Sequence, residues 1–329
     1  MLELRVMTWN VENLFSVAPG AEQSVIAAYQ QKLQSLAKII LQFGPDILAV
    51  QEIGNLEALD DLIALLENKY PHRIVSNSPD PRGIRVGFIS KLEITESENI
   101  KDLPQAGLSK IEASGERVTE ISRLGRGALR IQVNPKPSLS LNLINVHFKS
   151  KLLSYPPIDN RPRFQPINEN ERAYTAGLAL LKRTAEAVAV RVKANQLLEK
   201  DDNQALIVLG DFNDIPSAAT TQIINGPSGS EIGTTAFVRK DKGDSTRLFN
   251  LAPLIPSERR YSRIFKQNKE LIDSIFVSQE LLGDRRNNLP QVDSKVDFDN
   301  TLPSISDDPT IRENRPSSDH APITAIFEL

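Results

Sequence analysis

The 329-residue sequence contains no cysteine, and this absence removes two classes of site. Without thiols, the chain can form neither a disulfide nor a thiolate metal centre. A bound metal ion would therefore need oxygen or imidazole ligands. Histidine is also scarce, with three residues in the chain. Two of them lie in clusters of other polar residues, and this placement indicates a functional site.

Long apolar runs are absent as well. No stretch approaches the ~18 consecutive apolar residues that a membrane-spanning helix needs. The N-terminal MLELRVMTWN has neither the basic segment nor the long apolar segment of a secretory leader. We therefore expect a cytoplasmic protein without a membrane span.

The sequence lacks an excess of positive charge. Its net charge is −3 and its pI is about 5.8. A protein that binds nucleic acid regardless of sequence usually has a strongly basic face and a high pI, so the composition argues against that class. An enzyme acting on phosphates stays open, because a bound divalent cation would offset part of the negative charge.

The order of predicted elements indicates an α/β protein, and no linker-like break divides it, so we expect one domain over residues 1–329. The first part predicts a strand at 2–11, a helix at 23–43 that Gly44-Pro45 ends, a strand at 46–52 and a helix at 56–67. Short strands without intervening helices follow and predict antiparallel meanders, at 72–76, 85–90, 92–100, 126–133 and 139–148. The last part predicts a helix at 170–199, strands at 205–211, 270–278 and 321–329, and a long loop at 283–318.

The stretch ALIVLGDFND, at 205–214, is a buried strand that ends in oxygen ligands. Similar polar residues lie on or just past other apolar strands, where a rigid strand positions a side chain well. Each alone is explained by a turn, a cap or a solvated residue. Together they form a candidate site, and His72 alone among the histidines lies outside it. The residues so placed are Asn10, Glu52, His147, Asp211, Asn213, Asp273, Asp319 and His320.

Six stretches in order resemble the endonuclease/exonuclease/phosphatase superfamily, the deoxyribonuclease-I-like phosphoesterases. They are TWNVENLF, the Gln-Glu pair at 51–52, NVHFKSK, GDFND, IDSIFVS and SDHAPI, and they span nearly the whole chain. The resemblance implies a four-layer α/β sandwich, with two packed mixed sheets flanked by helices. The active site would lie at one edge of the sandwich, where strand ends from both sheets meet.

The resemblance also implies Mg²⁺-dependent phosphoester hydrolysis, with Mn²⁺ as an alternative metal. Glu52 would be the principal metal ligand, and Asn10 and Asp319 would complete or orient the metal shell. Asp211 would orient or deprotonate the attacking water. Asn213 would hydrogen-bond a phosphate oxygen or the nucleophile.

The two histidines receive separate roles from the same resemblance. Asp273 would pair with His320 and favour its charged form, which could then bind the phosphoryl group. His147 would donate a hydrogen bond to another phosphate oxygen or protonate the leaving group. The sequence departs from the family at Ser274, where relatives often have His or Tyr. It also has Arg85 near the place where some relatives have an acidic residue that supports the histidine equivalent to His147.

Three basic features have two interpretations each. Arg85 would either contact phosphate or be a solvated strand residue. Lys149 and Lys151 would lie on the same side as His147 if that strand continued, and would hold substrate phosphates, or they are ordinary surface lysines. The basic and aromatic segment at 258–269 would line a nucleic-acid groove or form a solvated segment around Tyr261 and Phe265.

The sequence leaves three functions to compare, all for a protein expected to be a monomer. The first is a divalent-metal phosphodiesterase whose partner is a phosphoester substrate, namely a nuclease on DNA or RNA. The second is a phosphatase or phospholipase on inositol phosphate, sphingomyelin or another small phosphoester. The third is a catalytically inactive scaffold, against which the retained polar set argues.

Overall fold

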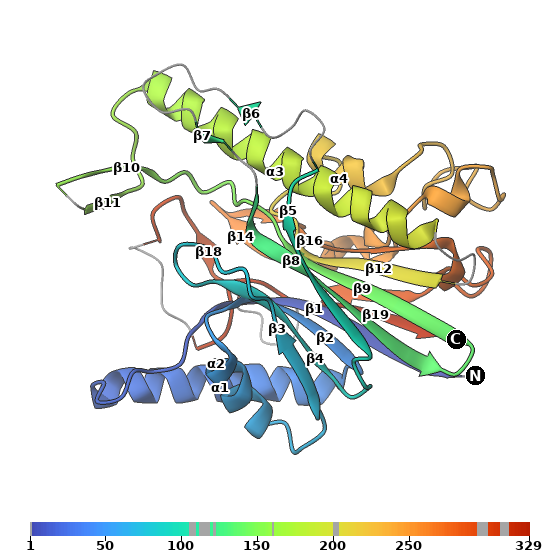
Figure 1. Ribbon diagram of the computed structural model, residues 1–329, viewed down its shortest axis with the longest axis horizontal. Helices are drawn as coiled ribbons and strands as arrows, with labels where there is room; N and C mark the ends of the chain where they lie inside the picture. Colours follow the sequence, from blue (N-terminus) through green and yellow to red (C-terminus); the bar gives the residue numbers. More distant parts are fainter. Residues whose placement is uncertain are drawn as a thin grey trace.

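The computed structural model describes residues 2–104, 110–111, 119–120, 123–159, 161–199, 204–294, 302–309 and 316–329. Two six-stranded sheets pack face to face, with helices on both outer sides (Figure 1). Helices α1 (Gln23–Phe43) and α2 (Leu56–Ala64) cover one sheet, and α3 (Glu169–Leu198) and α4 (Ala219–Asn225) cover the other. The expected four-layer α/β sandwich is confirmed.

The first sheet has the order β17-β19-β1-β2-β4-β3. Strand β1 runs parallel to β2, because α1 returns the chain to the starting edge, and it pairs antiparallel with the late strand β19. The bounds are β1 Glu3–Leu14, β2 Ile47–Ile53, β3 His72–Val75, β4 Arg85–Ser90, β17 Gln291–Ser294 and β19 Ile323–Glu328.

The second sheet has the order β13-β16-β12-β9-β8-β5. Strands β5, β8 and β9 form the expected antiparallel meander, and α3 connects β9 to the parallel strand β12. The bounds are β5 Glu96–Asp102, β8 Arg123–Lys136, β9 Leu139–His147, β12 Gln204–Asp211, β13 Phe249–Asn250 and β16 Asp273–Val277.

Smaller elements surround the sandwich. A three-stranded sheet combines β14 (Arg263–Phe265), β15 (Asn268–Glu270) and β18 (Ser304–Ile305). Two hairpins pair β6 (Lys110–Ile111) with β7 (Thr119–Glu120), and β10 (Tyr155–Ile158) with β11 (Arg161–Arg163). The described residues also form four 3₁₀ turns: η1 Asp244–Thr246, η2 Ala252–Leu254, η3 Ser257–Arg259 and η4 Gln279–Leu281.

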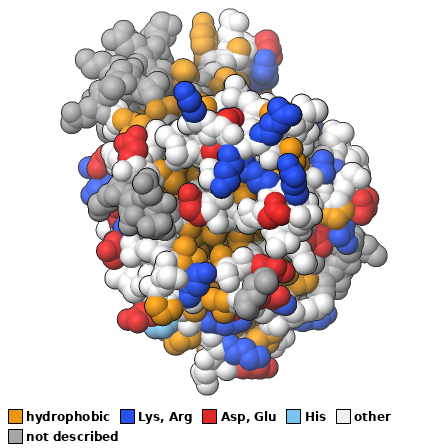
Figure 2. Space-filling view, turned by 90° about the vertical axis from the view of Figure 1, so that its right-hand side faces the viewer, with side chains coloured by type: hydrophobic (Ala, Val, Ile, Leu, Met, Phe, Trp, Pro, Cys, Tyr) orange, Lys and Arg blue, Asp and Glu red, His pale blue; other side chains and the backbone are white. Residues whose placement is uncertain are grey.

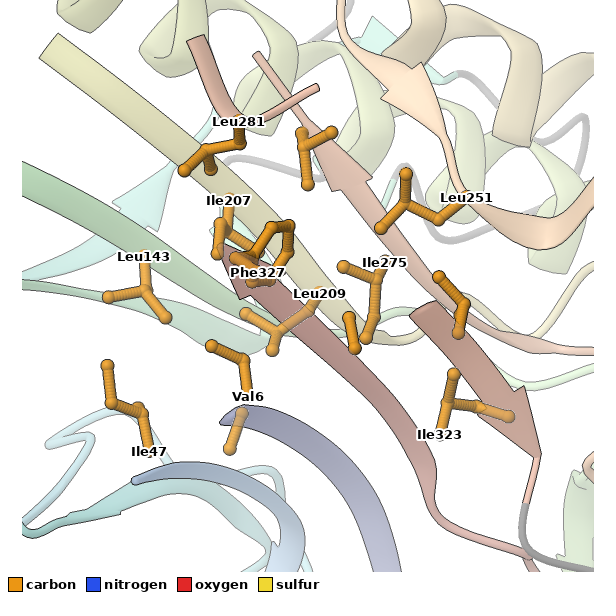
Figure 3. Packing of buried hydrophobic residues seen from close by; sticks show 14 of the residues in the cluster. Val6, Ile47, Leu143, Ile207, Leu209, Leu251, Ile275, Leu281, Ile323 and Phe327 are labelled. Carbon is orange, nitrogen blue, oxygen red and sulfur yellow. The ribbon is translucent and has the colours of Figure 1, made fainter. Parts of the chain in front are cut away.

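The main core lies between the two sheets (Figure 3). Val6 and Ile47 of the first sheet face Leu143 and Ile207 of the second, and all four side chains are fully buried. Alternation along each strand sends every second side chain into this layer. Burial of one such side chain contributes about 1.5–3 kcal/mol, so the strands form a rigid platform for whatever their ends carry.

Helix α1 has the bounds that the sequence predicts. Its buried residues lie on one face, and the helix ends where Gly44 adopts a left-handed conformation with φ 53°. The amide of Gly44 donates to the carbonyl of Ile40, which satisfies one of the last carbonyls of the helix. No helix in the described ranges is long and apolar enough to cross a membrane.

The predicted loop at 283–318 is wrong in part, because it contains β17 and β18. Strand β17 has the sequence QVDS and lies at the edge of the first sheet, held by backbone pairing to β19. A four-residue edge strand with polar side chains has no apolar run to reveal it. Residues 295–301 and 310–315 of that predicted loop lie outside the described residues.

Candidate active site

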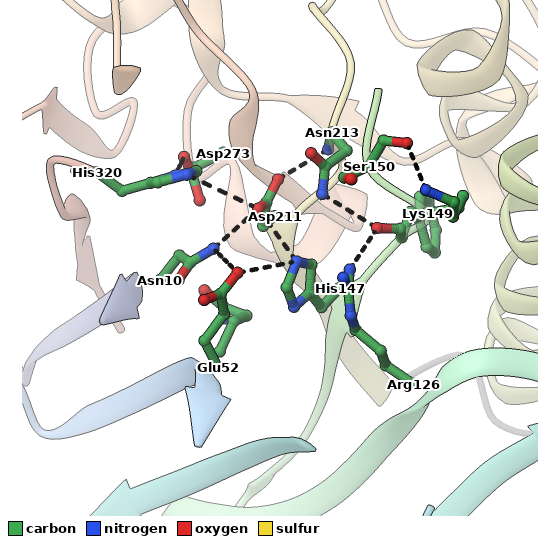
Figure 4. Close-up of polar contacts among 12 residues, drawn as sticks. Asn10, Glu52, Arg126, His147, Lys149, Ser150, Asp211, Asn213, Asp273 and His320 are labelled. Atoms are coloured by element: carbon green, nitrogen blue, oxygen red, sulfur yellow. Dashed lines mark hydrogen bonds and ion pairs between the residues drawn. The ribbon is translucent and has the colours of Figure 1, made fainter. Parts of the chain in front are cut away.

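Strand ends from both sheets meet at one edge of the sandwich (Figure 4). Asn10 and Glu52 come from β1 and β2 of the first sheet. In the second sheet, the register places His147 of β9 and Asp273 of β16 on either side of Asp211, the last residue of β12. The fold therefore brings together residues from positions more than 250 apart in the sequence.

Asp211 lies at the centre of this group and is buried. Its Oδ2 accepts a hydrogen bond of 3.0 Å from the Asn10 amide and lies 3.4 Å from Nε2 of His147. Its Oδ1 accepts the backbone N–H of Asn213 at 2.8 Å. The Asn10 amide is also 3.3 Å from Oε1 of Glu52, so these contacts join the two sheets at the site.

The surroundings of Asp211 raise its pKa to about 6. Burial is the largest cause and the charge of Asp273 adds to it, whereas His320, Arg263 and the hydrogen bond from Asn10 act in the opposite direction. A carboxylate with this pKa is ionised at neutral pH and is more basic than an ordinary aspartate. It can therefore accept a proton from a bound water.

His320 forms an ion pair with Asp273, with 2.7 Å between Nδ1 and Oδ2. Burial alone would lower the pKa of His320, but Asp273, followed by Asp319 and Asp211, raises it to about 10. The imidazole is thus charged at neutral pH. Its Nε2 lies 4.0 Å from Oδ2 of Asp211, and Nε1 of Trp9 donates to its backbone carbonyl at 2.8 Å.

His147 is the opposite case. Burial, followed by the charges of Arg126 and His320, lowers its pKa well below the ordinary value. Its Nε2 faces Asp211 and Glu52, and its buried Nδ1 has no hydrogen-bond partner among the described residues. A neutral imidazole can donate one hydrogen bond through Nε2, and that favours the first of its two expected roles over proton donation.

The arginine whose charge acts most strongly on His147 is Arg126, on β8, and not Arg85. Arg85 begins β4 opposite Ile53, and within the described residues no hydrogen bond or ion pair joins it to the site. Arg126 instead donates to the Phe148 carbonyl at 3.0 Å, directly after His147. Ser274 is buried and its Oγ has no partner in the described part of the chain.

The two lysines of HFKSK do not follow the strand alternation, because β9 ends at His147. Nζ of Lys149 donates to the carbonyls of Ser150 and Leu152 at 3.0 and 3.1 Å. Nζ of Lys151 forms an ion pair with Asp214 at 2.8 Å. Both ammonium groups therefore have partners within the protein.

The side of the site formed by the first sheet is crowded with carboxylates. Glu12 lies there together with Glu52 and Asp319. Its Oε2 accepts the backbone N–H of Asp319 at 3.1 Å. Burial, Asp319 and Glu52 raise the pKa of Glu12 to about 7, against the lowering effect of Lys32 on α1. Concentrated carboxylate oxygens with one nearby ammonium fit a divalent cation, which would neutralise charge on phosphoryl oxygens.

A second group could also hold a metal. Ligand atoms of Asp211, Asp273 and His320, all buried, lie within 4.8 Å of one another. In this group, Nδ1 of His320 is already paired with Oδ2 of Asp273, at 2.7 Å. The resemblance instead assigns the cation to Glu52, Asp319 and Asn10, and the carboxylate of Glu12 contacts Asp319 beside them.

Sequence reasoning missed Glu12 and Lys32. Four non-glycine residues at the site have positive φ: Glu12 (52°), Asn13 (50°), Glu52 (65°) and Asn213 (52°). Such backbone is strained and tends to occur at functional sites. None of these four positions is a glycine, so the sequence gives no sign of the left-handed backbone. The one signal for Glu12 as a site residue is its position two residues after Asn10.

A buried polar bridge lies beneath the site and connects the sheets. Nε2 of Gln51 donates to Oδ1 of Asn145 at 2.7 Å and to Oγ1 of Thr8 at 3.1 Å. Nδ2 of Asn145, on the second sheet, donates to the carbonyls of Val50 and Gly87 in the first. Gln51 directly precedes Glu52, and Asn145 lies two residues before His147. The bridge therefore fixes the distance between Glu52 and His147.

Comparison with solved structures finds the same fold at low identity. An endonuclease/exonuclease/phosphatase family protein from Leptotrichia buccalis matches with a TM-score of 0.55 and 16% identity, covering 99% of this chain and 100% of that one. TDP2 from C. elegans gives 0.55 and 16%, covering 99% and 75%. A mannosyl-6-phosphatase from Bacteroides thetaiotaomicron gives 0.56 and 16%, covering 99% and 100%.

Comparison by sequence gives a family but no characterised relative. No curated protein matches the chain. Residues 7–320 match the model of the Endonuclease/Exonuclease/phosphatase family. That match covers nearly the whole chain and includes every polar residue of the site, and the protein therefore belongs to this family of phosphoesterase hydrolases, which typically use divalent metal ions.

Proposed function

We propose that the protein is a Mg²⁺- or Mn²⁺-dependent phosphodiesterase that cleaves DNA or RNA. One observation carries the proposal: the charged His320 and the ionised Asp211 lie 4.0 Å apart, beside the carboxylates that would hold a metal. A positive donor, a base and a Lewis-acid site at one place are the groups that phosphoester hydrolysis needs.

The side chains would divide the work as follows. Nε2 of His320 would bind a phosphoryl oxygen, while Asp273 holds the ring and its charge. Nε2–H of the neutral His147 would bind a second phosphoryl oxygen. Asp211, positioned by Asn10 and the amide of Asn213, would orient the attacking water and take its proton. Glu52 and Asp319, with Asn10, would hold the metal, which stabilises the charge that develops on the phosphoryl group.

An inactive scaffold is the weakest of the three functions. A scaffold would have no need for a charged histidine held by a buried aspartate, nor for left-handed backbone at the two glutamates Glu12 and Glu52 beside the same centre. Backbone strain of order 1–3 kcal/mol per residue persists where the surrounding structure enforces it, and it clusters at working sites.

A small phosphoester is the second candidate substrate, and one observation favours it. In the basic segment at 258–269, Arg263 pairs with Glu270 at 2.8 Å, Arg259 pairs with Asp293 at 3.0 Å and Lys266 pairs with Asp307, so three of its five cations have a carboxylate partner. Figure 2 shows the opposite end of the sandwich, where Lys and Arg are interspersed with Asp and Glu around an apolar centre. One structural neighbour is a mannosyl-6-phosphatase, and a sugar phosphate is therefore the small substrate to compare.

The test is nicking of supercoiled plasmid by the purified protein in Mg²⁺, in EDTA, and with Asp211→Asn. The exposed Asp159→Asn is the matched control, since it makes the same chemical change on the β10–β11 turn. We expect nicking that requires both the metal and Asp211 and that survives in the control. If plasmid stays intact with Mg²⁺ and Mn²⁺ while a sugar phosphate is hydrolysed, the small-substrate function replaces the nuclease.

A further inference from the structure

A group of cations lies beside His147, and the division of work proposed above gives none of them a role. We call it the basic group. It lies on the side of His147 away from Glu52 and Asn10, as Figure 4 shows for Arg126 and Lys149. Its members come from the loop before β4, from β8, from the segment after β9 and from α3: Arg82, Arg126, Lys149, Lys151 and Arg183.

Shared carboxylates link these cations to one another. Asp80 contacts both Arg126, at 3.2 Å, and Arg82, at 3.4 Å. Asp214 contacts both Lys151, at 2.8 Å, and Arg183, at 3.2 Å. Each carboxylate is therefore divided between two cations and can neutralise only one of them.

Glu186 of α3 is the third carboxylate near the group, and it is buried. Its two oxygens accept the backbone N–H groups of Gly125 and Lys149, at 2.9 and 2.6 Å. The ammonium of Lys149 itself donates to backbone carbonyls and forms no ion pair among the described residues. Five cations thus meet three carboxylates, and the group keeps an excess of positive charge.

The excess charge acts on its own members and on the site. Burial and the charge of Arg126, followed by Lys182 and Arg183, lower the pKa of Lys149 to about 8. Arg126, Arg82 and Lys149 all contribute, after burial, to the lowered pKa of His147. The catalytic centre therefore has a carboxylate-rich side and a cation-rich side, and a metal can balance only the first.

We propose that the basic group is a subsite for a second phosphate of the substrate, next to the phosphoester that is cleaved. The inference rests on the proposed function, and it adds that the preferred substrate carries at least two phosphates. Arg82 supplies an exposed guanidinium, with a side chain 57% exposed, and its planar donors suit phosphate oxygens. Arg126 and Lys149 supply buried charge behind it.

A second phosphate can come from the neighbouring nucleotide of a nucleic-acid strand or from a small molecule with two phosphates. The hydrolysis test compares a dinucleotide with a terminal phosphate, the same dinucleotide without it, and bis-p-nitrophenyl phosphate. The variant is Arg82→Ala, and Arg286→Ala, exposed after η4, is the matched control. Arg82 is exposed, so its removal leaves the core intact.

We expect Arg82→Ala to raise KM for the phosphorylated dinucleotide about tenfold, the effect of losing one charge-assisted contact. KM for the other two substrates, and kcat for all three, should change less than about twofold. An equal change for substrates with and without the second phosphate, or no change in a variant that remains active, would overturn the subsite.

A binding experiment without hydrolysis tests the subsite independently of the proposed function. Calorimetry with the wild type and Arg82→Ala compares a nucleoside bisphosphate with its monophosphate, and an inositol bisphosphate with its monophosphate. We expect the bisphosphate of one pair to bind about tenfold more tightly, and Arg82→Ala to remove that preference. The pair that shows the preference identifies the source. If neither shows it, the subsite is rejected, whether or not the protein hydrolyses DNA.

Discussion

At the scale of single residues, Lys149 shows most clearly that a charge placed for phosphate binding can lower the stability of the fold. Burial of its ammonium next to Arg126 lowers the pKa from 10.5 to about 8. Between these values the folded protein binds fewer protons than the unfolded chain, so stability rises with pH over that interval. Below pH 8 the whole cost of holding a charged lysine there is present.

We therefore predict that Lys149→Met stabilises the protein by about 1 kcal/mol at pH 7, after the loss of two carbonyl hydrogen bonds is subtracted. The gain should shrink as pH rises from 8 toward 10.5. Urea unfolding at pH 7 and pH 10 measures it, with the exposed Lys242→Met as control. A destabilised variant at pH 7, or a gain that grows with pH, would contradict the account.

Single residues also show how far the sequence alone reaches. The ends of β9 and β12 could be predicted from apolar runs, and with them the places of His147 and Asp211. The pairing of Asp273 with His320 was expected from the resemblance, and the contact is present. Arg126 could not be identified, because its nearness to His147 depends on strand pairing between β8 and β9, which no local pattern of the sequence specifies.

At the scale of elements, the polar bridge between β2 and β9 sets the geometry of the site. We predict that Asn145→Leu lowers kcat about tenfold, because Glu52 and His147 lose their fixed separation. It should also cost about 2–4 kcal/mol of stability, since Gln51 loses one of its partners and the buried carbonyls of Val50 and Gly87 lose a donor. Activity is measured well below the unfolding temperature of the variant.

The same strand provides the control. Asn142 is also buried on β9, but it accepts from Nε of Arg130, at 2.7 Å, on β8. Asn142→Leu should cost similar stability and leave kcat within about twofold. If both variants lose activity in parallel with stability, the bridge is only structural and does not position the site.

Elements were predicted unevenly, for a physical reason. Helix α1 and strand β4 have the predicted bounds, because each combines a strong apolar pattern with a clear end. Strands β17 and β18 were missed because they are short and their pairing uses only backbone groups. Lys149 and Lys151 were placed by continuing the strand alternation, but β9 ends at His147, two and four residues before them.

At the scale of the whole molecule, the carboxylates of the site make metal binding a stability effect. We predict that Mg²⁺ at about 100 times its Kd stabilises the fold by about 2.7 kcal/mol, which raises Tm by about 4 °C for a chain of this size. Trp9 is the single tryptophan and contacts His320, so its fluorescence should report the same binding without any substrate.

Glu52→Gln gives a sharper form of this prediction. Without metal, the variant should be more stable than the wild type, because one charge leaves a crowded group with Glu12 and Asp319. It should lose the Mg²⁺-dependent rise in Tm and the change in fluorescence. Glu57→Gln, exposed in the first turn of α2, should keep both responses. A Glu52→Gln protein that still responds to Mg²⁺ would exclude Glu52 as a ligand.

The pairing of β1 with β19 has a consequence for the protein during its synthesis. Strand β1 is made long before β19, so one of its edges has no neighbour until β19, which follows His320, has also been made. A nascent chain that ends before His320 holds most of the site but lacks the residue that completes it. We therefore expect a nascent chain to gain activity only after the segment from His320 to the end of β19 has been made and has paired with β1.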